Sequence, residues 1–183
     1  MERAAELFAE RGIAGTSLDE VLAAAKAGKG QFYHYFRGRD ELAAAAVGFR
    51  CGQVLAGLTQ ALGDVSSLAG LEQALAGFVA GFEQAGLPGC PIGTLATEVA
   101  GRNEDARVQA AAGFDAWERL LADALERMRQ RGELRADASP AVLATGLLAS
   151  IEGGMVLSQA RKDVASLRIA VDTGLAQVRA YLK

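Results

Sequence analysis

The segment 16–42 contains two short helical patterns separated by a tight turn, and it constrains the fold more than any other part of the chain. Ser17 and Glu20 have the S-x-x-E spacing of a capping box, which predicts a helix that begins at Leu18. The apolar run then breaks, and Gly28 is suited to be the N-cap of a second helix. Two helices joined in this way predict a helix-turn-helix, whose second helix enters the major groove of DNA.

The predicted second helix, over 29–36, carries side chains that suit contact with DNA. A lysine, a glutamine, two tyrosines and the only histidine of the chain lie within it. Phe32 and Phe36 are four residues apart, so both can point inward and anchor the helix to a core. We therefore expect the phenylalanines to be buried and the polar residues to face solvent.

The rest of the chain is predicted to be helical as well. Alanine and leucine are abundant, and only three prolines occur in 183 residues. Apolar residues recur with helical spacing between breaks that contain glycine, proline, serine or aspartate. The prediction is an all-α fold of about nine helices, in which an N-terminal three-helix domain precedes a larger helical domain. The predicted helices cover residues 2–11, 18–25, 29–36, 39–62, 68–82, 92–100, 104–130, 140–161 and 164–182.

The charge of the chain is unevenly distributed. The formal net charge is −3, which by itself argues against a nucleic-acid partner. Residues 26–50, however, contain five cations and two anions, so this segment is locally +3. Residues 1–25 and 51–183 each carry −3. Because phosphate neutralisation acts over short distances, the local excess near the predicted second helix is the relevant quantity.

The sequence of residues 29–42 resembles the TetR/AcrR family of bacterial transcriptional regulators. The run KGQFYHYF over 29–36 is followed by Arg-Asp-Glu-Leu over 39–42, at the offsets typical of that family. The upstream run AELFAERG over 5–12 fits the family's first helix. In similar proteins this helix begins several residues earlier, often after a basic arm, so we expect Met1 to lie inside it. The resemblance implies a DNA-binding domain over 1–46 and an effector-binding and dimerisation domain over 47–183.

The DNA-binding residues are predicted from chemistry and family position together. Lys29 can reach a phosphate, and Gln31 suits the bidentate recognition of adenine. Arg39 occupies a position where similar proteins usually have lysine and is expected to pair with a phosphate. Thr16 and Ser17 begin a helix whose amides can hold a phosphate. The full set of candidates is Thr16, Ser17, Lys29, Gly30, Gln31, Tyr33, His34, Tyr35 and Arg39.

The turn departs from the family pattern at two positions. Lys26 lies where similar proteins have glycine, and Gly28 lies where they have a serine or threonine cap. Compared with a serine or threonine cap, a glycine cap weakens a helix by only about a few tenths of a kcal/mol, so it is tolerated. Lys26 either adds a phosphate contact or strains the turn, and the sequence leaves both open.

The last two predicted helices indicate a homodimer. Apolar residues of the last helix recur with a spacing close to a heptad, and the preceding helix is apolar around much of its circumference. Gly146, Gly153 and Gly154 permit a close approach of helices. Similar proteins dimerise through these two helices as a four-helix bundle, although the same residues could instead complete the core of one protomer. The predicted dimerisation residues are Leu147, Ile151, Leu167, Val171, Leu175 and Val178.

Aromatic residues and methionines of the middle helices suggest a site for a small effector. Such groups more often form a core, but the family resemblance implies a largely apolar cavity among these helices. The predicted effector-binding residues are Phe78, Phe82, Cys90, Phe114, Trp117, Leu121, Glu152 and Met155, with Thr94, Glu98 and Gln159 as further polar candidates. Glu152 either orients the effector or lies at a surface or dimer interface. The resemblance favours a repressor that its effector releases from a palindromic operator.

Two alternative functions are also compatible with parts of the sequence. Cys90 precedes a predicted helix, so a repressor that senses electrophiles or redox state through its thiol is an alternative. A helical protein–protein adaptor with a vestigial helix-turn-helix is another. An enzyme, a cofactor or a metal site is not expected, because no second histidine, metal-ligand cluster or phosphate-binding glycine loop occurs. We expect a cytoplasmic protein, since the sequence shows neither a signal peptide nor an apolar run of membrane-spanning length.

Overall fold

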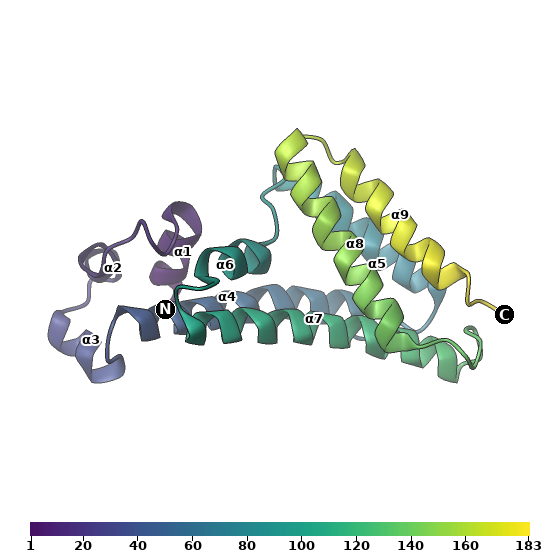
Figure 1. The fold of residues 1–183 in the computed structure, drawn as a ribbon, viewed down its shortest axis with the longest axis horizontal. Coiled ribbons are helices and arrows are strands. Elements are labelled where there is room, and N and C mark those ends of the chain that lie inside the picture. Colours follow the sequence, from purple (N-terminus) through teal and green to yellow (C-terminus); the bar gives the residue numbers. More distant parts are fainter. The chain divides into compact units, whose positions relative to one another are not determined.

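The computed structural model describes all 183 residues, and it is composed of α-helices with no β-strand (Figure 1). The predicted all-α class is confirmed, and so is the number of helices. In chain order the helices are α1 (Glu2–Arg11), α2 (Leu18–Ala25), α3 (Lys29–Tyr35), α4 (Arg39–Leu62), α5 (Leu68–Gln84), α6 (Pro91–Val99), α7 (Glu104–Gln130), α8 (Pro140–Arg161) and α9 (Ala165–Arg179).

The helix ends follow local chemistry, so they agree closely with the sequence. Asn103 caps α7, because its Oδ1 accepts the N–H of Ala106 at 2.9 Å. Ser67 caps α5, because its hydroxyl accepts the N–H of Gly70 at 3.2 Å. The last helix ends at Arg179, three residues earlier than the predicted end at 182.

The chain folds into two compact units. The first contains residues 1–55 and 91–114, and the second contains residues 56–90 and 115–183. Helices α4 and α7 therefore each contribute residues to both units. This division groups α6 with the helix-turn-helix, whereas the sequence had suggested one boundary near residue 46.

A small hydrophobic core holds the helix-turn-helix together in the first unit. Phe8 of α1, Leu22 of α2 and Phe32 of α3 are buried with the start of α4. Phe36 packs against this core, with its ring stacked 5.5 Å from that of Phe32. The predicted inward orientation of both phenylalanines is therefore observed. Burial of one large side chain from each short helix fixes the position of α3, which alone would be too short to be stable.

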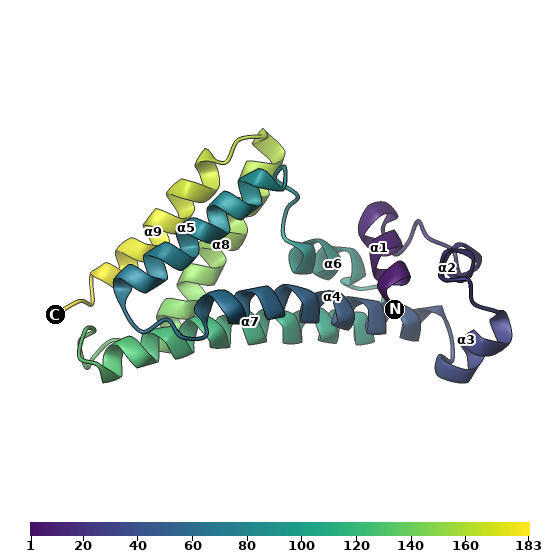
Figure 2. The same ribbon diagram turned by 180° about the vertical axis from the view of Figure 1, so that it is seen from behind.

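In the second unit, α5, α8 and α9 lie side by side (Figures 1 and 2). Glycines allow α8 and α9 to approach closely, since a Cβ atom on Gly154 would lie 2.7 Å from the Cβ of Ala170. A Cβ atom on Gly174 would lie 2.6 Å from Cδ1 of Leu147. The predicted role of the glycines of α8 in helix packing thus applies to Gly154 and to Gly146, where a Cβ atom would lie 2.8 Å from Oε1 of Gln177 in α9, whereas Gly153 faces open space.

Two of the helices, α4 and α8, are long and apolar enough to cross a membrane by length and composition alone. Core helices of folded domains pass the same test. In α8 the apolar residues include Leu143, Leu147 and Ile151, which are all buried within the protein. Burial thus accounts for part of the apolar composition of this helix, whose exposed side also carries apolar residues such as Val142 and Val156.

Candidate DNA-binding surface

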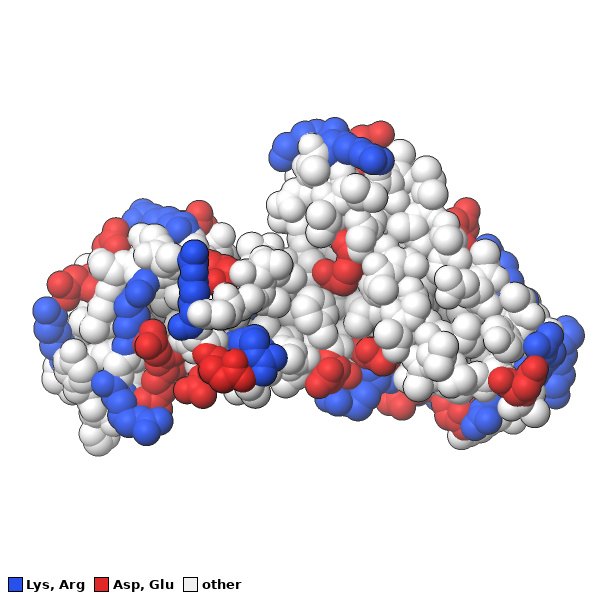
Figure 3. Space-filling view, viewed as in Figure 1, with Lys and Arg blue, Asp and Glu red and all other residues white.

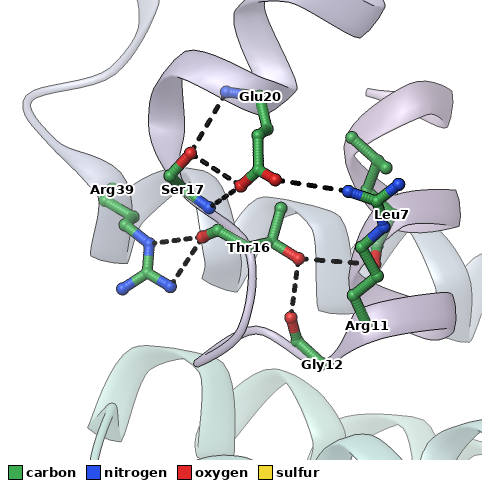
Figure 4. Close-up of polar contacts among 7 residues, drawn as sticks. All are labelled: Leu7, Arg11, Gly12, Thr16, Ser17, Glu20 and Arg39. Atoms are coloured by element: carbon green, nitrogen blue, oxygen red, sulfur yellow. Dashed lines mark hydrogen bonds and ion pairs between the residues drawn. The ribbon is translucent and has the colours of Figure 1, made fainter.

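The entry to α2 is fixed by the predicted capping box (Figure 4). The Ser17 hydroxyl donates to Glu20 Oε2 at 2.7 Å and accepts the Glu20 N–H at 3.3 Å, while the Ser17 N–H donates to the same carboxylate at 2.8 Å. These bonds from the Ser17 side chain and backbone lower the pKa of Glu20. Arg11 of α1 adds an ion pair to Glu20 at 3.2 Å. The Ser17 side chain is thus committed to the helix cap.

Two residues predicted to contact phosphate, Thr16 and Arg39, have side chains that form hydrogen bonds within the fold. Thr16 is only 1% exposed, and its hydroxyl donates to the carbonyl of Gly12 at 2.8 Å. The guanidinium of Arg39 donates to the carbonyl of Thr16 at 2.9 Å (Figure 4). It also donates to the carbonyl of Ile13. Arg39 therefore joins the start of α4 to the loop before α2. The sequence predicts that Arg39 binds a phosphate, whereas in the structure its guanidinium is bonded to backbone carbonyls and acts as a structural clamp.

A second bond attaches the same loop to α6. Glu98 Oε1 accepts the N–H of Ala14 at 2.8 Å. Glu98 had been a candidate for orienting an effector, and the structure instead places its carboxylate against the loop between α1 and α2. Together with Arg39, it fixes this loop from two helices that are distant in sequence.

The turn between α2 and α3 is a Schellman motif. Lys26 adopts the left-handed conformation, with φ 52° and ψ 38°. The N–H of Ala27 donates to the Leu22 carbonyl at 2.9 Å, and the N–H of Lys26 donates to the Ala23 carbonyl at 3.2 Å. Gly28 follows as the N-cap of α3 without a side-chain cap.

The polar side chains of α3 face solvent around a single buried anchor. Phe32 is the buried residue of this helix, whereas Tyr33 and Tyr35 are 60% and 67% exposed. Gln31 and His34 are also exposed. Exposed tyrosines leave apolar surface in water, so this face is suited to a partner. The structure brings together the candidates Lys29, Gly30, Gln31, Tyr33, His34 and Tyr35 on one short helix.

The cations near α3 are largely paired with carboxylates. Lys29 Nζ lies 3.0 Å from Asp19 Oδ1, and this contact raises the pKa of Lys29. Arg37 pairs with Glu41 at 3.2 Å. In the view of Figure 3, blue and red groups are interspersed over the N-terminal helices. On this face, the local excess of positive charge does not form a continuous basic patch.

Comparison with known proteins assigns this arrangement to a family. The model of the family described as bacterial regulatory proteins, tetR family, matches residues 1–46, and the model of the LmrA/YxaF-like C-terminal domain of transcriptional regulators matches residues 67–173. The transcriptional regulator AcuR of Cereibacter sphaeroides is 30% identical over 154 residues, which are 82% of this chain and 70% of that protein. This chain is a TetR-family transcriptional regulator.

Further similarities agree with this assignment. The HTH-type transcriptional repressor DhaR of Mycobacterium sp. strain GP1 is 24% identical over 156 residues, covering 85% of this chain and 78% of that protein. The crystal structure of regulatory protein TetR from Rhodobacter sphaeroides is 27% identical, with a TM-score of 0.78 over 96% of this chain and 94% of that one. The predicted family is confirmed, as is the prediction that this is not an enzyme.

In the second unit of this TetR-family regulator, the predicted dimerisation residues form the protomer's own core. All six are buried within one protomer, so they cannot be the surface that meets a second copy. The heptad-like spacing of α9 therefore describes its packing on α8 and α5. The exposed residues of α8 and α9 are others. The apolar or small ones include Val142, Ala149, Val156 and Ala160 on α8, and Ile169, Thr173 and Ala176 on α9, and charged residues such as Arg168 and Asp172 are also exposed.

The predicted effector-binding residues of the second unit are mostly buried. Trp117 is 2% exposed, and its ring lies 5.8 Å from that of Phe78. Phe82, Leu121 and Met155 are buried as well, while Phe114 lies in the first unit. These contacts are those of a hydrophobic core.

Glu152 of α8 is the polar exception among these residues. Its Oε1 atom is buried and has no hydrogen-bond partner. Burial raises the pKa of Glu152, and a hydrogen bond from the Cys90 thiol acts in the opposite direction. Cys90 itself is buried, which restricts its access to reagents in solution.

Proposed function

We propose that this protein is a dimeric repressor that binds a palindromic operator in the cytoplasm and is released from it by a small, largely apolar effector. The observation that carries the proposal is the exposed polar face of α3, held by the buried ring of Phe32. A helix of this kind, preceded by a tight turn and a second helix, places its side chains against base edges in the major groove. Repression is supported by the similarity to DhaR.

The contacts of α3 divide into two kinds. Gln31 is exposed near the start of the helix and bears both a donor and an acceptor, as recognition of adenine requires. Lys29 carries a charge that can leave Asp19 for a phosphate, because the two groups are both exposed and such surface pairs are weak. Gln31 therefore supplies sequence information, whereas Lys29 positions the helix.

A second copy of the chain is proposed to cover the exposed face of α8 and α9. Val142, Ala149 and Val156 are spaced by seven residues, so they lie along one side of α8. Val142, Val156 and Ile169 are 70%, 59% and 67% exposed. In the view of Figure 3 the middle of the surface over α8 and α9 carries few charged groups. A palindromic operator requires two recognition helices, which such a dimer supplies.

The effector is proposed to bind in the second unit, beside Glu152. Its apolar part would replace contacts now made by core residues such as Trp117, and a donor group would satisfy the buried Oε1 of Glu152. Effector binding lowers the affinity for the operator only if the effector binds the DNA-free protein more tightly than the DNA-bound protein. The operator then lowers the affinity for the effector by the same factor. Because Oε1 of Glu152 is an acceptor, the effector is proposed to be a mostly apolar molecule with an N–H or O–H group that donates to it.

Selection from a library of random DNA duplexes tests the proposal. Wild-type protein should enrich a palindrome with half-sites about one or two helical turns apart, at ~34 Å per turn. The Gln31→Ala variant should enrich a palindrome that differs at one or two positions of each half-site. Failure of the wild type to enrich any inverted repeat would contradict the proposal.

A further inference from the structure

Lys26 occupies a position where the backbone favours glycine. It is the left-handed residue of the Schellman motif that ends α2, and its side chain is exposed. A Cβ atom disfavours this conformation, so glycine is usual here and lysine is not. Glycine or asparagine would close the same turn with less strain.

Lys26 also differs from the other cations of the helix-turn-helix in having no partner. Within residues 1–46, every other lysine and arginine is engaged inside the protein. Arg3, Arg11, Lys29 and Arg37 form ion pairs with Glu6, Glu20, Asp19 and Glu41, and Arg39 donates to backbone carbonyls. The ammonium of Lys26 makes neither an ion pair nor a hydrogen bond. It is the one lysine or arginine of this domain that can meet an anion without giving up a contact inside the protein.

The place of Lys26 specifies the anion. The residue lies in the turn of the helix-turn-helix, three positions before Lys29, with which α3 begins. When the recognition helix enters the major groove with its N-terminal residues at base edges, the first helix of the motif crosses the DNA backbone, and Lys26 lies at the end of that first helix. A lysine there reaches phosphate oxygens, which carry charge but no sequence information. We propose that Lys26 is a phosphate contact of each protomer, which strengthens binding to all operators equally.

This inference rests on the proposed function, because it assumes that α3 enters DNA. It assigns to Lys26 the role that the sequence had given to Arg39. Arg39 is bound to the Thr16 carbonyl and cannot leave without releasing the loop, whereas Lys26 loses no internal contact when it binds a phosphate.

The chain contains a matched control for the effect of backbone strain. Lys162 ends α8 in the same left-handed conformation, with φ 55° and ψ 36°, and it too is exposed. It lies in the second unit, outside the residues 1–46 that match the tetR DNA-binding family. Lys26 and Lys162 therefore have the same backbone strain. A substitution that affects DNA binding at Lys26 but not at Lys162 acts through the charge in the turn of the helix-turn-helix.

The experiment measures binding to the palindrome selected by wild-type protein as a function of salt concentration. Lys26→Gly and Lys26→Asn both remove the charge and both tolerate the left-handed conformation. Each should weaken binding about tenfold, because a dimer loses two exposed ion pairs. The slope of log affinity against log salt should fall by about 1.8, or ~0.9 for each lysine. Lys26→Arg should restore both quantities, and Lys162→Gly should change neither.

Melting temperature and base preference complete the test. Neither neutral variant should melt below the wild type, since each relieves strain in the turn. Single-base changes in the operator should reduce the affinity of Lys26→Gly by the same factors as for the wild type. An unchanged salt slope in both neutral variants, with the wild type still bound to its palindrome, would overturn this inference and leave the proposed function intact. Absence of any selected palindrome would instead refute the proposed function, and this inference with it.

Discussion

Substitution of Arg39 by alanine should destabilise the helix-turn-helix itself. The guanidinium donates to the carbonyls of Ile13 and Thr16, and the side chain is half-buried. Hydrogen bonds from a charged donor contribute ~1.5 kcal/mol each at the lower end of their range, so loss of two bonds lowers the free energy of unfolding by about 3 kcal/mol. For a chain of this length, that change lowers the melting temperature by roughly 6–12 °C.

Thermal unfolding followed by circular dichroism measures the effect, and Arg37→Ala is its control. Arg37 lies two positions earlier, its side chain is 91% exposed, and its ion pair with Glu41 is a surface pair. Removal of such a pair changes stability by about 0.5 kcal/mol or less, so the control should melt within ~2 °C of the wild type. A normal melting temperature for Arg39→Ala, combined with weaker DNA binding, would refute the clamp and restore Arg39 as a phosphate ligand.

Two further predictions concern the second unit. Val156→Glu should leave the fold intact, because this side chain is exposed in the protomer, but should yield monomers in sedimentation; Val108→Glu, at an exposed site on α7, should remain dimeric. If Val156→Glu sediments as a dimer, the proposed interface is wrong. Glu152→Gln should raise the melting temperature at neutral pH. Burial raises the pKa of Glu152 in the folded state, so its ionised form destabilises the fold at high pH, and the advantage of glutamine should vanish as pH falls to about 4.3. An advantage independent of pH would show that the charge of Glu152 is not its cause.

The helices and their caps could be predicted because their determinants are local. Ser17 and Glu20 are three residues apart and satisfy each other's backbone, so the pattern alone fixes the start of α2. Phe32 and Phe36 lie on one side of a short helix, so their inward orientation follows from spacing. Such signals need no knowledge of the remainder of the chain.

The roles of charged residues could not be predicted, because their partners are distant in sequence. Arg39 and Thr16 are 23 residues apart, and Glu98 and Ala14 are 84 apart. No spacing rule links such pairs. The dimerisation residues were misassigned for a related reason, since an apolar stripe indicates burial but not which surface buries it. The seven-residue spacing of Val142, Ala149 and Val156 was the available signal for the exposed face.

The distribution of charge has a consequence for regulation under the proposed function. Most cations of the DNA-binding domain have an internal carboxylate partner, so each phosphate contact they make must replace an ion pair within the protein, and a single half-site should bind weakly. Two linked recognition helices bind far better than one, because the second contact is intramolecular. Operator occupancy therefore depends strongly on whether both helices engage together. An effector that alters the dimer can then release DNA without touching α3, and the salt dependence of binding should be modest for a protein of this family.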